Sequence, residues 1–103
     1  QPLKPEELRK ILDIMVKSVA DRVQSKQIEL HVDENVKLKL TREGYNPMFG
    51  ARPLRRLVTK YVEDLVSESL LKNPLIKKGR VIKIVLNEYN QVVIQEDKAA
   101  VLF

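Results

Sequence analysis

The chain opens with apolar residues that recur three or four positions apart. This spacing predicts one amphipathic helix over residues 3–25, with Pro5 in its first turn and acidic residues just after it. Its predicted apolar stripe comprises Leu8, Ile11, Leu12, Met15, Val19 and Val23. Ile14 falls off this stripe, among polar neighbours. It is either a single exposed apolar residue, which is common, or part of a second surface covered by something outside the chain.

The periodicity then changes to an alternation of apolar and polar residues. Over residues 27–32 this alternation predicts a half-buried strand. His31 lies on the polar face of that strand, where we expect it to be solvated and without a functional role. A short helix is predicted over residues 33–43, because Asp33 is a good N-cap and Gly44, which can take a positive φ, can end the helix.

The second half of the chain predicts one long helix and a hairpin. The helix spans residues 53–72, and its stripe comprises Leu54, Leu57, Val58, Tyr61, Val62 and Leu65. Strands are predicted at residues 80–86 and 91–95, joined by a turn. The order is thus helix-strand-helix-helix-strand-strand. Because three short strands must pair and the helices must cover one face of the sheet, we expect an α+β fold with three helices on a small three-stranded sheet. Residues 1–95 form the predicted domain, and residues 96–103 form a tail.

Composition excludes several classes of function. The chain has 103 residues, a net charge of +5, no cysteine and one histidine, which excludes disulfides and multi-histidine zinc sites. It has no apolar run near the roughly 20 residues that span a membrane, and no visible targeting peptide. Phosphate-cradling glycine loops, nucleophile elbows and metal clusters are absent from the sequence, so we expect this chain alone to catalyse nothing. Its first residues look like the middle of a chain, and we expect a fragment.

One constellation of charges suggests a ligand. Arg52, Arg55 and Arg56 lie at the predicted start of the long helix, just after a turn containing Gly50. Arg52 and Arg56 are four residues apart, and like charges at this spacing cost roughly 0.2–0.5 kcal/mol. The helix dipole also disfavours cations at this end. Both effects favour a bound anion or an acidic partner, while the alternative is a solvated basic face whose side-chain stems cover apolar surface.

The same segment carries a resemblance to a known family. The sequences Gly-Tyr-Asn-Pro at residues 44–47 and Gly-Ala-Arg-Pro-Leu-Arg-Arg at residues 50–56 resemble the sensor 2 segment of Clp ATPases. These are the AAA+ unfoldases of the ClpA, ClpB and ClpC group. The resemblance covers nearly the whole chain, and the sequence is more similar to ClpC than to ClpB. The chain resembles the C-terminal small domain that follows the second ATPase module.

The resemblance implies a role in a nucleotide site. Arg52 would be the sensor 2 arginine, which reads the γ-phosphate and couples hydrolysis to subdomain motion. Gly50, Ala51, Arg52 and Ile14 would form this chain's side of the site. The implied cofactor is ATP, with Mg²⁺ held by the large domain, which is absent here. The parent protein would be an ATPase.

The resemblance also implies partners and a location. The implied partners are the AAA+ large domain of the same chain, neighbouring subunits of a homo-hexamer and, through parts not present here, a ClpP-type protease and protein substrates. Neither a membrane nor a nucleic acid is expected as a partner. The implied location is a bacterial cytoplasm or the stroma of a plastid-type organelle.

Two other functions remain open from the residues. The chain is a small basic nucleic-acid-binding module if Arg52, Arg55 and Arg56 contact phosphates, although few aromatic residues are present and none interleaves with the arginines for base stacking. It is a pure assembly domain if nucleotide contact is incidental. Salt-dependent binding of short DNA or RNA distinguishes the first of these functions from the nucleotide-sensing one.

Overall fold

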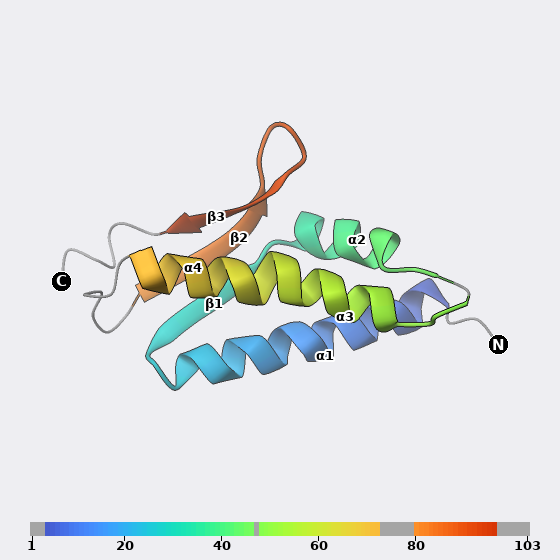
Figure 1. Ribbon diagram of the computed structural model, residues 1–103, viewed down its shortest axis with the longest axis horizontal. Helices are drawn as coiled ribbons and strands as arrows, with labels where there is room; N and C mark the ends of the chain where they lie inside the picture. The colour runs from blue at the N-terminus through green and yellow to red at the C-terminus, as the bar shows by residue number, and fades with distance from the viewer. Residues whose placement is uncertain (1–3, 47, 73–79, 97–103) are drawn as a thin grey trace.

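The long helix and the sheet form two layers around one apolar core. The computed structural model describes residues 4–46, 48–72 and 80–96. The elements are α1 (Pro5–Gln24), β1 (Ile28–Val32), α2 (Glu34–Glu43), α3 (Arg52–Val58), the π-helical turn η1 (Thr59–Glu63), α4 (Asp64–Lys72), β2 (Arg80–Leu86) and β3 (Val92–Glu96). Figure 1 shows α3, η1 and α4 running on as one long helix beside α1. The predicted α+β class and order of elements are therefore confirmed.

The three strands form a mixed sheet in the order β1-β2-β3. The pairing of β2 with β3 is antiparallel, with Leu86 opposite Val92, as the predicted hairpin requires. The pairing of β1 with β2 is parallel and begins with Ile28 opposite Arg80. β3 ends at Glu96, so residues 97–103 of the predicted tail lie outside the described residues, as does the predicted helix start at residue 3.

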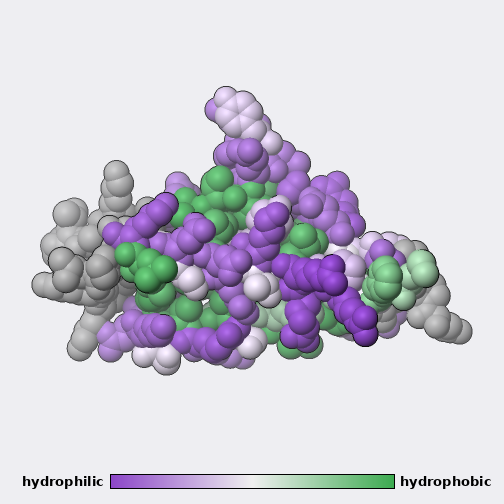
Figure 2. All heavy atoms as spheres, in the orientation of Figure 1, coloured by the Kyte–Doolittle hydropathy of each residue, from purple (hydrophilic) through white to green (hydrophobic). Residues whose placement is uncertain are grey.

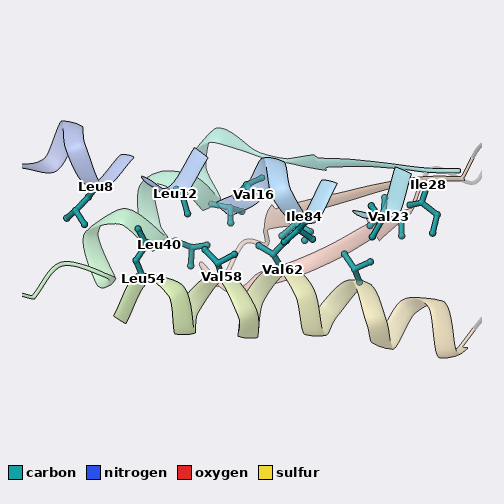
Figure 3. Close-up of a cluster of buried hydrophobic side chains, with 14 residues drawn as sticks. Leu8, Leu12, Val16, Val23, Ile28, Leu40, Leu54, Val58, Val62 and Ile84 are labelled. Atoms are coloured by element: carbon teal, nitrogen blue, oxygen red, sulfur yellow. The ribbon is translucent and has the colours of Figure 1, made fainter. Parts of the chain in front are cut away.

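One cluster of buried side chains joins all the helices to one face of the sheet (Figure 3). Its members are Leu8, Leu12, Val16, Val19, Val23, Ile28, Val36, Leu40, Leu54, Val58, Val62, Val66, Ile82 and Ile84. The predicted stripe of α1 missed Val16, which is buried, and included Ile11 and Met15, which are only partly buried. The side of α1 that faces the core is centred on the direction shared by Leu8, Leu12, Val19 and Val23. At about 100° per residue, Val16 points to the same side of the helix, and its side chain is buried there.

The long helix departs from the prediction at η1. Its buried apolar positions recur every four residues, at Leu54, Val58, Val62 and Val66. In an ideal α-helix of 3.6 residues per turn, positions four apart drift round the axis by roughly 40° at each step. The wider π turn absorbs this drift, so that Val66 faces the core and the predicted stripe residue Leu65 is only partly buried.

An ion-pair network fixes α1 against α2. The Arg9 guanidinium donates to both carboxylate oxygens of Glu34, at 2.5 and 2.7 Å, and to Asp13 at 3.0 Å. The Lys37 ammonium lies 3.7 Å from Asp13. The hydrogen bonds from Arg9 hold the pKa of the Glu34 carboxyl below its usual range. This contribution to stability is therefore present above the unfolded pKa of Glu34 and is lost as the pH falls through its folded pKa.

Gly44 ends α2 for a different reason from the one predicted. Its φ is −85°, so no left-handed conformation is needed. Instead, α2 and α3 approach each other closely at this point. A Cβ at Gly44 would lie 2.8 Å from Leu54 Cδ1 and 2.9 Å from both Leu54 Cα and the Leu40 carbonyl oxygen. Because Leu54 Cα is a backbone atom of α3, a side chain at Gly44 has to push the two helices apart.

Gly44→Ala should therefore destabilise the 103-residue chain, by about 1–3 kcal/mol. Chemical denaturation of the two proteins measures this difference. Gly50→Ala is the matched control, because Gly50 has a φ of +61° and open space where a Cβ would lie. It should cost only the backbone strain of a left-handed alanine, about 1–2 kcal/mol. A Gly44→Ala protein as stable as the wild type would show that α2 and α3 separate without cost.

Candidate functional site

A compact loop leads from α2 to the start of α3. The Asn46 Oδ1 atom accepts hydrogen bonds from the backbone N–H groups of Met48 (2.8 Å) and Phe49 (3.3 Å). The N–H of Gly50 donates to the Asn46 carbonyl oxygen at 3.0 Å, and Gly50 itself takes the left-handed conformation. The N–H of Arg52 donates to the carbonyl oxygen of Phe49 at 3.3 Å. The loop thus fixes where α3 begins, although Pro47 of the predicted Asn-Pro turn lies outside the described residues.

Arg52 is the first residue of α3, with Ala51 as the N-cap and Pro53 in the first turn, as predicted. The side chains of Arg52, Arg55 and Arg56 are all exposed. Among the residues that the structure describes, none of the three guanidinium groups has a hydrogen-bond or ion-pair partner. No acidic residue lies in the first turn of α3. Figure 2 shows strongly hydrophilic atoms gathered over α3 and a hydrophobic patch beyond its start, where Met48 and Phe49 are exposed.

A groove of about 210 Å³ runs between α1 and the first half of the long helix. We call it the α1–α3 groove. Ile14, Met15 and Val58 supply apolar lining, and Arg55 and Thr59 supply polar lining. Ile14 is 69% exposed, so it contributes little to the core and much to this groove.

An ion pair at the α1–α3 groove connects its two walls. The Arg22 Nη2 atom on α1 lies 2.6 Å from Glu63 Oε1 on η1, and both residues line the groove. The pair spans from one helix to the other and closes one part of the groove.

The structure brings the predicted site residues together in two groups. Gly50, Ala51 and Arg52 are contiguous where α3 starts. Ile14 lines the α1–α3 groove, and so does Arg55, three residues after Arg52 on α3, whereas Arg52 is not among the lining residues. The sequence prediction included Arg55 only in the basic cluster and missed Thr59. Arg55 lies on α3 and Thr59 on η1, where these elements face α1. The spacing of residues along the sequence does not reveal how these helices pack together.

The described residues also limit other chemistry. Within the described ranges, no group of histidine and acidic residues is arranged to hold a metal ion. None of the described helices is long and apolar enough to cross a membrane.

Comparison with known proteins identifies the family. The sequence pattern of the C-terminal D2-small domain of ClpB protein matches residues 3–84. The chain belongs to this family. The D2-small match includes the loop, α3, the α1–α3 groove, β1 and most of β2, so it covers every residue of the candidate site.

Relatives of the D2-small chain occur in plastids and bacteria. The chloroplastic "ATP-dependent Clp protease ATP-binding subunit ClpA homolog CD4B" of Solanum lycopersicum is 47% identical over 73 residues, which are 71% of this chain and 8% of that protein. The chloroplastic chaperone protein ClpC of Pisum sativum is 39% identical over 88 residues, 85% of this chain and 9% of that protein. The chaperone protein ClpB of Aquifex aeolicus is 37% identical over 84 residues, 82% of this chain and 8% of that protein. The D2-small chain thus spans about a tenth of the length of these relatives.

Proposed function

We propose that this D2-small domain belongs to a hexameric, ATP-dependent Clp unfoldase and supplies the sensor 2 arginine, Arg52, to its nucleotide site. The observation that carries the proposal is the position of Arg52. Its guanidinium is exposed and unpaired within the described residues, at the first position of a helix that the loop and the core hold in place. An unpaired arginine on a rigid support is suited to bind an anion supplied by another part of the protein.

The residues of this chain fit a nucleotide. Phosphates require permanent positive charge and a planar fork of donors, which Arg52 and Arg55 offer. The flat, weakly polar base requires an apolar wall, which Ile14 offers in the α1–α3 groove. Bound ATP would supply the phosphoryl group for hydrolysis. Mg²⁺ would be held by the large domain.

The same arrangement supports a coupling role. Arg52 is attached to the core through Leu54 and Val58, which are both buried, and Ile14 is attached through α1. A ligand that touches Ile14 and Arg52 therefore contacts a single rigid body. Loss of the γ-phosphate would remove the contact to Arg52 and free this body to move relative to the large domain. The whole protein would then assemble into a hexamer and bind a ClpP-type protease and protein substrates.

For location, we propose the stroma of a plastid, with a bacterial cytoplasm as the alternative. Chloroplastic relatives include the proteins of tomato and pea, while the Aquifex aeolicus relative is bacterial. Import of a fluorescent fusion of the whole protein into isolated chloroplasts would separate the two locations.

A nucleic-acid-binding role has one observation in its favour. Tyr45 and Phe49 are exposed in the loop that leads to Arg52, so aromatic faces do lie close to the basic cluster. Binding of a short single-stranded oligonucleotide that weakens with salt and depends on Phe49 would favour this role over nucleotide sensing.

The test of the proposed site uses Ile14. In the full-length ATPase, Ile14→Ser should weaken binding of a fluorescent ATP analogue by about tenfold, because burying this side chain against the base is worth roughly 1.5 kcal/mol. The same substitution should leave the melting temperature of the 103-residue chain nearly unchanged. Leu71→Ser is the control, because Leu71 is 80% exposed on α4 and should affect neither quantity. A large loss of stability on Ile14→Ser would place Ile14 in the core instead.

A further inference from the structure

A second hollow, of about 800 Å³, lies between the first half of α1, helix α2 and the end of β2. We call it the α1–α2 hollow. It shares no lining residue with the α1–α3 groove, so the proposed nucleotide site makes no use of it. The ion pair of Arg9 on α1 with Glu34 on α2 holds these two helices together.

The lining of the α1–α2 hollow has an apolar part, which we call its floor, and a charged part, which we call its rim. Pro5, Leu38 and Leu86 line the floor, from three different elements. Leu38 is 49% exposed, although its neighbours two residues away on α2, Val36 and Leu40, are fully buried. Within the part of the chain that the structure describes, about half of the surface of this leucine stays uncovered. An apolar floor in a hollow of this size is suited to take an apolar side chain from outside.

The rim of the hollow is positively charged. Lys10 and Arg42 line it and are exposed, and neither has an ion-pair partner among the described residues. Arg9 also lines it, but Glu34 and Asp13 already neutralise its charge. Glu6 is the one acidic residue in the lining. The free charge at the rim is therefore positive, which favours a partner with carboxylates and disfavours a basic one.

We propose that the α1–α2 hollow binds an acidic, leucine-bearing peptide segment of another protein. A leucine side chain of the peptide packs on Leu38 and Leu86, and flanking carboxylates pair with Lys10 and Arg42. The two features require each other: an uncharged apolar peptide would leave both cations unpaired, and a basic peptide would be repelled at the rim. This surface is independent of the proposed nucleotide site, since the two share no residue.

The test measures fluorescence anisotropy of a labelled peptide of alternating glutamate and leucine, titrated with the 103-residue chain at low salt. We expect saturable binding that Leu38→Ser weakens about tenfold, because the floor then loses its main apolar contact. The double variant Lys10→Glu/Arg42→Glu should weaken binding at least as much, and 0.5 M salt should weaken binding to the wild type. Leu71→Ser and Lys60→Glu are the matched controls, since both residues are exposed outside the hollow and should leave the affinity unchanged.

Several results would overturn the proposal. Equal affinity for a lysine–leucine peptide would rule out the charge complementarity, and binding unaffected by Leu38→Ser would place the peptide elsewhere. Concentration-dependent dimerisation that Leu38→Ser abolishes would make a second copy of the chain the occupant. Tighter peptide binding after removal of residues 97–103 would assign the hollow to the chain's own end. Circular dichroism and thermal melts of each variant confirm that the fold is intact, and nucleotide affinity of the full-length protein reports separately on the proposed function.

Discussion

Under the proposed function, replacing Arg52 with alanine in the full-length protein should slow ATP turnover by roughly 10- to 100-fold. The reason is that a hydrogen-bonded contact to a charged group is worth about 1.5–3 kcal/mol, and each 1.36 kcal/mol changes a rate tenfold. The rate at which the full-length protein unfolds a model substrate should fall by at least the same factor. The proposed coupling of hydrolysis to subdomain motion also depends on the contact between Arg52 and the phosphate. The 103-residue Arg52→Ala chain should melt at the wild-type temperature, since Arg52 is exposed and unpaired within the described residues.

Two further variants sharpen the test of Arg52. Arg52→Lys keeps the charge but loses the planar fork of donors, so it should recover only part of the turnover. Arg56→Ala removes an equally exposed arginine one turn further along the helix, away from the start of α3 and from the lining of the α1–α3 groove, so its effect should be smaller. Arg55 is a poorer control because it lines that groove beside Ile14.

The pattern of results decides between functions. If Arg52→Ala keeps the wild-type rate of ATP turnover while Arg56→Ala loses it, the sensor arginine is Arg56 and not Arg52. Wild-type behaviour in both variants would make the cluster a solvated basic face. Steady-state ATPase and unfolding rates, measured beside melts of the corresponding short chains, separate these outcomes from a loss of fold.

Leu54→Ala should produce the largest loss of stability, about 2–5 kcal/mol, which is typical of emptied leucine sites. Leu54 is fully buried, and its Cα and Cδ1 atoms lie against Gly44 where α2 meets α3. The surroundings are held by backbone on both sides and have little freedom to close around the cavity. For a domain of this size, the loss corresponds to a fall in melting temperature of at least about 8 °C.

The control for Leu54 is Leu57→Ala on the same helix, because Leu57 is only partly buried. It should cost clearly less than Leu54→Ala in the same denaturation experiment. Equal losses in the free energy of unfolding would mean that Leu57 contributes as much to stability as Leu54, although it is only partly buried. A negligible cost at Leu54 would mean that α3 is not anchored at its first turn, which would also weaken the rigid-support argument for Arg52.

The sequence predicted the local elements well because their signals are local. Asp33 accepts a hydrogen bond from the N–H of Asn35, as an N-cap does, and Pro53 lies in the first turn of α3. The errors come from tertiary contacts. Gly44 is required by the approach of Leu54, which no spacing rule reveals. The π turn arises because the long helix must keep Val62 and Val66 on the core, so packing overrides the 3.6-residue period there.

In the candidate site too, the features with local sequence signals were predicted, and those that depend on tertiary contacts were missed. Arg52 and Gly50 were predicted from a contiguous motif, and the exposure of Ile14 follows from its place off the apolar stripe. The pairing of Ile14 with Arg55, and the Arg22–Glu63 ion pair at the groove, depend on how α1 packs against the long helix. The α1–α2 hollow was not predicted at all, because it is formed by three elements that are far apart in the sequence.

The parallel pairing of β1 with β2 sets an order for folding during synthesis. β1 leaves the ribosome before β2, and Ile28 and Val32 pair with Arg80 and Ile84, which are made much later. Closing such a distant contact costs chain entropy that only the completed strand repays. Until then, the apolar faces of α1 and α2 lack the strand side chains against which they pack. A nascent chain stalled before β2 therefore exposes apolar surface of α1 and α2 that Ile82 and Ile84 cover in the folded domain.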